Sequence, residues 1–158
     1  MTGLRELALV LGIVSVGLIA GLFASFAYAV MPGLGQTDDK SLIASMQRIN
    51  VVIVNPVFLL LFFGGLGFTV AAAVLYRDHR MFWWIVAGAV LYGLGLVITM
   101  AFNIPLNNRL EAAGEPDRIG DLRAVRDVFE ASWVRWNIVR AVVHAAAFAV
   151  LVVGAVTR

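Results

Sequence analysis

Long apolar segments alternate with short polar ones along the chain. The apolar segments cover residues 7–31, 49–76, 81–103 and 133–156. A helix rises about 1.5 Å per residue, so each segment is long enough to cross a hydrocarbon core of about 30 Å. The pattern predicts an all-α membrane protein whose single domain, residues 1–158, is an antiparallel bundle of four transmembrane helices.

Amphipathic stretches precede the second and fourth spans. Residues 39–48 follow the capping residues Asp38 and Asp39, and residues 121–132 run without a helix breaker into the fourth span. We therefore expect the second and fourth helices to extend beyond the bilayer on the same side.

Proline and glycine mark the expected interruptions. The first span should end at Pro32-Gly33 and Gly35, and the third at Asn103, before an external loop at 109–120. Pro56 lies inside the second span. It cannot donate an amide hydrogen and crowds the carbonyl four residues back, so we expect a kink there.

The composition supports the membrane assignment. The chain is 61% hydrophobic and 14% charged, with a net charge of +2, whereas soluble domains are about a quarter charged. Basic residues do not run together with interleaved aromatics, which argues against nucleic acid as a partner. Cysteine is absent, which excludes disulfides, thiolate catalysis and cysteine-ligated metals.

An even number of spans places both termini on one side of the membrane. We expect this to be the cytoplasmic side of the cell membrane. Eight of the twelve lysines and arginines lie on the other side, which opposes this orientation. Three of those eight, Arg48, Arg135 and Arg140, lie on helices, where a structural or site role can hold them.

The fourth span carries polar residues where lipid should be. Trp133, Asn137, Arg140 and His144 are spaced four, three and four apart, so they form one stripe on the helix. A charge at the bilayer centre costs from about 2.5 to more than 10 kcal/mol. Arg140 should therefore face the bundle interior with a partner, or extend outward to the headgroups.

Other helices offer polar groups at a similar depth. They are Tyr28 at the end of the first span, Gln47, Asn50 and Asn55 on the second helix, and Asn103, Asn107 and Asn108 at the end of the third. Side chains from several helices converging at one level are typical of a pocket in a bundle. Glycines at positions such as 12, 17, 88 and 95 are typical of helix packing instead.

The residue types in this predicted pocket favour an organic ligand. The two histidines, His79 and His144, lie at opposite ends of the bundle, and Glu130 is the nearby carboxylate. Haem, zinc and di-iron sites need several convergent His, Cys or carboxylate ligands, so we expect no protein-bound metal. Amides, an arginine and tryptophans suit a planar, apolar molecule that carries oxygens.

Four segments together carry a family resemblance: 26–34 (FAYAVMPGL), 46–50 (MQRIN) followed by Asn55-Pro56, 102–108 (FNIPLNN), and 133–137 (WVRWN) followed by Arg140. The chain resembles the anthrone oxygenase-like family of small four-helix membrane proteins, long catalogued as a domain of unknown function. The resemblance implies a cofactor-independent oxygenase that converts an anthrone to an anthraquinone in a polyketide pathway, with dioxygen as co-substrate.

The implied roles can be assigned to residues of this chain. Arg140, Asn137 and Asn103 would stabilise an enolate oxyanion, and the base would be His144, Glu130 or water. Gln47 and Asn55 would orient the other oxygens. The remaining candidate substrate-binding residues are Tyr28, Asn50, Asn107, Trp133 and Trp136.

Two other functions fit the same residues. A non-catalytic membrane binder or accessory protein would hold a quinone, lipid or pigment in the pocket. A small transporter is less consistent with the sequence, because no internal repeat is visible and only Pro56 breaks a span. Glycines on lipid-facing surfaces leave room for a homodimer.

Overall fold

The computed structural model describes residues 2–157. Within them, four helical segments are long and apolar enough to cross a membrane: Gly3–Leu34, Pro56–Leu75, Phe82–Ala112 and Leu122–Val156. The chain is therefore an all-helical, multi-pass membrane protein, as its hydrophobic pattern predicts. Association with a lipid bilayer follows, because the outward faces of these spans are apolar.

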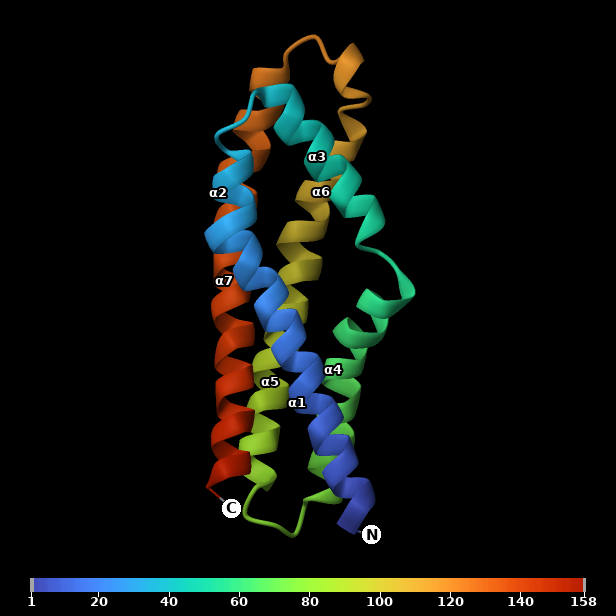
Figure 1. The fold of residues 1–158 in the computed structure, drawn as a ribbon, viewed down its shortest axis with the longest axis vertical. Helices are drawn as coiled ribbons and strands as arrows, with labels where there is room; N and C mark the ends of the chain where they lie inside the picture. The colour runs from blue at the N-terminus through green and yellow to red at the C-terminus, as the bar shows by residue number, and fades with distance from the viewer. Residues whose placement is uncertain (1, 158) are drawn as a thin grey trace.

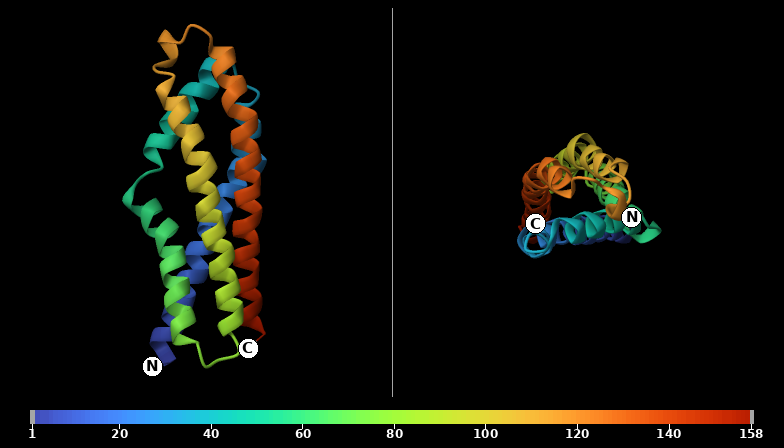
Figure 2. Two further views of the ribbon diagram at one scale, coloured as in Figure 1. Left: turned by 180° about the vertical axis from the view of Figure 1, so that it is seen from behind. Right: turned by 90° about the horizontal axis from the view of Figure 1, so that it is seen from above.

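The spans pack around a common interior (Figures 1 and 2). Helix α1 (Thr2–Ser25) packs against α4 (Pro56–Leu75) and α7 (Leu122–Val156), and α5 (Phe82–Ile98) packs against the same two helices. Helix α1 begins and α7 ends at one end of the bundle, where the short turn between α4 and α5 also lies (Figure 1). We call this the terminal end.

The opposite end carries the extensions. Helix α3 (Asp39–Val52) crosses it obliquely, α6 (Ile104–Ala112) continues the third span, and the first half of α7 passes beside both (Figure 1). We call this the distal end. The extension of the fourth helix agrees with expectation. The third span also reaches this end, because its helix continues past Asn103 to Ala112, where an external loop was expected from Arg109.

The second span differs most from expectation. Pro56 does not kink one long helix. Helix α3 ends at Val52, residues 53–55 form a connection, and α4 begins at Pro56 with Asn55 as its N-cap. The Asn55 side chain accepts from the amide of Phe58 at 3.0 Å and donates to the Val52 carbonyl at 3.1 Å. Pro56 has no N–H to donate to that carbonyl, and the Asn55 side chain donates to it instead. Asparagine and proline together therefore start a new helix.

The other two prolines within the membrane-spanning segments, Pro32 and Pro105, lie directly after wide turns. Phe26–Val30 (η1) precedes Met31-Pro32, and Thr99–Asn103 (η2) precedes Ile104-Pro105. In each turn the amide that follows bonds to the carbonyl five residues back, as in a π helix. This spacing lets the helix continue where a proline would otherwise end it. The first span therefore runs on through the short helix α2 (Met31–Leu34).

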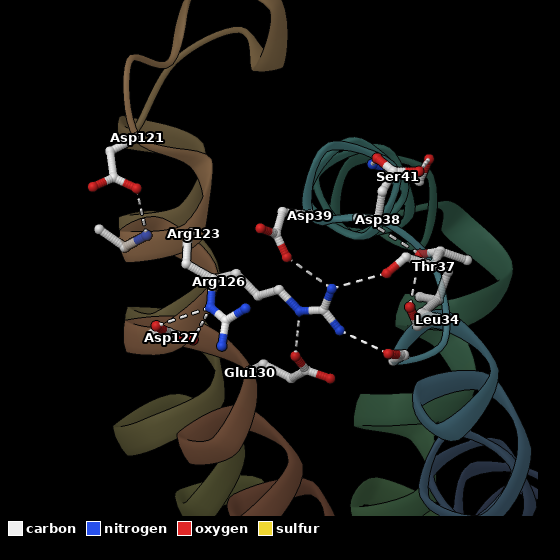
Figure 3. Close-up of polar contacts among 12 residues, drawn as sticks. Leu34, Thr37, Asp38, Asp39, Ser41, Asp121, Arg123, Arg126, Asp127 and Glu130 are labelled. Atoms are coloured by element: carbon white, nitrogen blue, oxygen red, sulfur yellow. Dashed lines mark hydrogen bonds and ion pairs between the residues drawn. The ribbon is translucent and has the colours of Figure 1, made fainter.

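An arginine ties the distal end together (Figure 3). Arg126 of α7 donates to the carbonyls of Gly35 and Thr37 at 2.8 and 2.9 Å, and to the carboxylates of Asp39 and Glu130 at 2.9 and 2.6 Å. We call this group the Arg126 network. It fixes the loop between α2 and α3 against α7.

The start of α3 lies beside this network. Asp38 caps the helix, as its position in the sequence predicts. Hydrogen bonds from the hydroxyl and amide of Ser41 hold the pKa of the Asp38 carboxyl below its usual value.

Candidate functional site

The polar stripe of α7 faces the interior of the bundle. The exposed fractions of Trp133, Asn137, Arg140 and His144 are 2%, 0%, 7% and 0%. Arg140 therefore does not extend to the lipid headgroups. Its guanidinium lies among side chains of the bundle.

The Arg140 guanidinium is held by an amide oxygen and two aromatic rings. Its Nε and Nη2 donate to Oδ1 of Asn137 at 3.1 and 3.0 Å. Its central carbon lies 3.9 Å from the ring centre of Phe23 and 5.4 Å from that of Trp133. Among residues 2–157, no carboxylate forms an ion pair with it. Within the described residues, the guanidinium charge is therefore balanced by amide and carbonyl dipoles and by ring faces.

Asn137 orients this cation. It is fully buried, and its Nδ2 donates to the backbone carbonyl of Phe23 at 3.2 Å. That bond aims Oδ1 of Asn137 at the guanidinium. Asn137 and Phe23 thus form one unit with Arg140 that joins α7 to α1.

His144 contacts this unit but does not line the cavity beside Arg140. Its Nδ1 is 2.7 Å from the carbonyl oxygen of Arg140. A carbonyl can only accept, so Nδ1 carries the proton and Nε2 keeps its lone pair. That Nε2 is buried and has no hydrogen-bond partner in the described part of the chain. The ring packs edge-on against Phe23 and Tyr92, with centroid distances of 5.1 and 4.9 Å.

The third span contributes two amides near Trp133. Trp133 Nε1 donates to Oδ1 of Asn107 at 2.7 Å. Asn103, fully buried in the wide turn η2, donates from Nδ2 to the Trp133 carbonyl at 3.4 Å. Its Oδ1 is buried and has no hydrogen-bond partner among the residues that the structure describes. The sequence predicts both amides near the stripe, and in the structure both contact Trp133.

The remaining predicted residues have different surroundings. Gln47 donates to the carbonyls of Leu110 and Gly114, both at 2.9 Å, and so ties α3 to the end of α6. Asn55 is exposed and caps α4. The Tyr28 side chain is 74% exposed and points away from the interior. Trp136 stacks on Phe102 with ring centres 3.5 Å apart.

A cavity of about 210 Å³ lies beside Arg140. Besides Arg140, its polar lining is Asn50, Thr99 and Asn107, and aromatic rings line much of the rest: Phe23, Phe26, Phe58, Phe62, Phe63 and Trp133. Asn50 Nδ2 is buried without a hydrogen-bond partner among the residues described. The cavity therefore offers a cation, amide groups and aromatic faces to a ligand.

Sequence reasoning missed the aromatic walls. Phe23, Phe58 and Phe62 looked like ordinary span residues, because phenylalanine is common in any lipid-facing helix. Only the packing of α1 and α4 shows that these rings face inward. Phe58 and Phe62 stack with centroids 5.1 Å apart, and Phe62 meets Phe23 edge-on at 6.3 Å.

Glu130 is not close to this cavity. Its carboxylate belongs to the Arg126 network, and it precedes Arg140 by ten residues, or about 15 Å along α7. Within residues 2–157, no three His, Cys, Asp or Glu side chains cluster as a metal site would require, so no metal ligands are assigned.

The family model described as anthrone oxygenase matches residues 57–150. This is more than half of the chain. The chain belongs to the anthrone oxygenase family. The matched segment includes Asn103, Asn107 and the whole stripe from Trp133 to His144, whereas Tyr28, Gln47, Asn50 and Asn55 precede it. No curated protein and no solved structure gives a significant match to the chain.

Proposed function

We propose that this protein is a cofactor-independent oxygenase that oxidises a planar, anthrone-like aromatic substrate with dioxygen. The observation that supports it best is Arg140. Its guanidinium borders an aromatic cavity within a membrane-spanning helix and lacks a carboxylate partner in the described chain. A buried cation without a counter-ion suits a ligand that becomes an anion.

The cavity suits the shape of such a substrate. Phe58, Phe62 and Trp133 would contact a flat ring system, while Asn50 and Asn107 would donate to oxygens at its far end. Asn107 already accepts from Trp133, so its NH₂ group is the part left for a ligand. The substrate would therefore carry acceptor oxygens on two sides.

Arg140 would promote loss of a proton from the substrate. The methylene of an anthrone lies opposite a ketone, and its deprotonation gives an enolate whose charge rests on oxygen. A preformed cation in a low-dielectric site lowers the pKa of that methylene by stabilising the oxyanion. Asn137 would keep the guanidinium in place, because it already accepts two of its hydrogen bonds.

The enolate would then react with dioxygen without a resident oxidant. One electron passes to dioxygen, and the resulting radicals combine into a peroxide at the former methylene carbon. Loss of water from that peroxide gives the second ketone. In sum, a CH₂ group and O₂ become a C=O group and H₂O, so atoms and electrons balance.

The base that removes the proton from the substrate methylene would be water that enters with the substrate. Glu130 is held by Arg126. His144 has a free lone pair, but the ring of Phe23 contacts both its imidazole and the Arg140 guanidinium, and His144 does not line the cavity. Its role in the proposal is to fix the turn that carries Arg140.

Replacing Arg140 by Leu tests the proposal. We expect oxygen consumption with an anthrone to fall at least a hundredfold, since one oxyanion donor typically contributes a factor of about 10²–10³. Arg140→Lys keeps the charge but loses the bidentate hydrogen bond to Asn137. Its rate of oxygen consumption should lie between those of Arg140→Leu and the parent protein. Arg135 is an exposed arginine on the same helix, so Arg135→Leu is the matched control and should retain full rate.

The purified Arg140→Leu variant should also stay folded and monodisperse in detergent. If it oxidises the anthrone as fast as the parent protein, Arg140 does not stabilise an oxyanion, and the proposed mechanism is wrong.

One observation favours a second candidate, a non-catalytic binder of a quinone or similar ligand. Arg140 is the one titratable side chain on the cavity wall among the residues described, so the cavity itself presents no general base. A binder would retain a bound aromatic molecule, detectable by mass spectrometry of the purified protein, and would consume no oxygen with an anthrone.

A further inference from the structure

The wall of the cavity includes residues that also face outward. Leu59 and Phe63 of α4 are 37% and 52% exposed, and Met100 and Ile104 on the third span are 48% and 41% exposed. A residue that lines a cavity and is also exposed marks its opening. Val54, in the connection before α4, also lines the cavity and is 62% exposed. The opening therefore runs from the start of α4 along the space between α4 and the η2–α6 segment.

This opening lies at the depth of lipid. Helix α4 has 20 residues, which at 1.5 Å each is about 30 Å and matches the hydrocarbon core. Its first residue, Pro56, therefore marks one boundary of that core. Leu59 and Phe63 follow by three and seven residues, so they lie about 4.5 and 10 Å inside it.

The path from the cavity to water at the distal end is packed with apolar side chains. Leu42, Ile43 and Met46 of α3 are fully buried there against Leu110 and Phe129. The Arg126 network holds α3 and its loop over this cluster (Figure 3). Towards the terminal end, the interior is filled by a second apolar cluster that includes Phe62, Tyr92 and Leu96.

We infer that the cavity exchanges its ligand sideways with the bilayer, through the opening between α4 and the η2–α6 segment. The ligand is a planar aromatic molecule dissolved in the lipid, and the acceptor oxygen that it presents to Arg140 draws it inward. This inference needs the cavity but not the reaction, so it goes beyond the proposed function. The break at residues 53–55 is what allows the opening, since it lets α4 start away from α6 (Figures 1 and 2).

The natural chain has no cysteine, so single cysteines can report on the opening. Leu59 lines the cavity, whereas its neighbour Leu60, 63% exposed, does not. Leu59→Cys and Leu60→Cys in proteoliposomes form a matched pair at one depth on one helix. Met100→Cys and Val97→Cys repeat the comparison on the third span, where Val97 is exposed but outside the cavity. Glu115→Cys marks the water-exposed loop.

Each variant is treated with a bilayer-soluble pyrene maleimide or with a charged, water-soluble maleimide, with and without anthraquinone in the lipid. We expect the pyrene reagent to label all four membrane positions and the charged reagent to label Glu115→Cys alone. Anthraquinone should slow pyrene labelling severalfold at Leu59→Cys and Met100→Cys, and leave Leu60→Cys and Val97→Cys unchanged.

Two outcomes would overturn the inference. Labelling of Leu59→Cys by the charged reagent at the rate of Glu115→Cys would show that the cavity opens to water. Equal effects of anthraquinone at Leu59→Cys and Leu60→Cys would show that no aromatic ligand enters here. Oxygen consumption is measured separately. Selective protection in a protein that consumes no oxygen with an anthrone would contradict the oxygenase and leave the lateral route intact.

Discussion

Arg140 shows what single-residue reasoning can and cannot provide. A charged residue in a 35-residue membrane-spanning helix must face the interior or the headgroups, because lipid is too costly. Its spacing from Asn137 and His144 predicts one inward stripe, and all three are buried. Trp133 lies on the predicted stripe, but Phe23 could not be predicted as a cation-binding ring, since a phenylalanine in an apolar run carries no signal of which way it faces.

Asn55 illustrates the opposite error. An asparagine directly before proline is a common helix start, with the amide as N-cap and proline in the first turn. The unbroken run of apolar residues around it suggested one continuous helix with a kink instead. The local signal was correct, and the hydrophobic pattern obscured it because Ile53 and Val54 of the connection are apolar.

His144 depends on a glycine across the helix interface. A Cβ atom built on Gly95 would lie 2.1 Å from Cε1 of the imidazole, so Gly95→Ala must displace the ring or the helix. We expect a loss of about 1–3 kcal/mol in unfolding free energy, measured by denaturation in detergent. A Cβ on Gly93 would meet its nearest neighbour, Leu66, only at 4.0 Å, so Gly93→Ala should be close to neutral. Equal effects would show that the interface adapts freely.

The role of His144 can be separated from that of a base. Asparagine places its NH₂ group near the position of Nδ1 and keeps the bond to the Arg140 carbonyl, while glutamine reaches the position of Nε2 instead. We expect His144→Asn to retain most of the turnover and His144→Gln to lose more, as measured by oxygen consumption with an anthrone across pH. A general base contributes a factor of about 10²–10⁴ to the rate. A loss of turnover of that size in both variants would identify His144 as the general base.

Between elements, the Asn55 cap controls where α4 starts. Asn55→Ala removes the acceptor for the Phe58 amide and the donor for the Val52 carbonyl. We expect the unfolding free energy to fall by about 1 kcal/mol, together with faster amide hydrogen exchange at residues 57–59, measured by mass spectrometry. Asn55→Ser keeps an acceptor and should lose less. If alanine and serine behave alike, the cap does not stabilise the helix start.

The sequence predicts how some helices are placed relative to one another, but not others. The charged turn at 77–80 is short, so α4 and α5 had to be antiparallel neighbours, and they pack together. The path of the third span was not predictable, because Pro105 reads as a stop signal. The wide turn at Thr99–Asn103 compensates for the proline, and no residue type in that turn announces it.

At the scale of the whole molecule, the bundle can lie in the membrane in either of two orientations. Both ends of the described chain lie at the terminal end of the bundle, and the 113–121 connection lies at the distal end (Figure 1). We expect the terminal end to face the cytoplasm. A fluorescent protein fused at the C-terminus should then fold and emit, whereas alkaline phosphatase fused there should stay inactive. The reverse pattern would invert the assignment.

The overall architecture followed from bulk properties. The number of spans comes from hydropathy, and their order around the bundle is constrained by short connections. The position of the cavity did not follow, because it depends on the break before α4 and on the face that each helix turns inward.

The wide turn in the third span has a consequence for chain length. Each residue in a helix adds about 100° of rotation, and a π turn contains one residue more than an α turn. Asn107 meets Trp133 at 2.7 Å only with that extra residue in place. A single-codon deletion within 99–103 would rotate everything after it by more than a quarter-turn and swing the Asn107 amide away from its tryptophan. This stretch should therefore tolerate exchanges of side chain far better than any change in its number of residues.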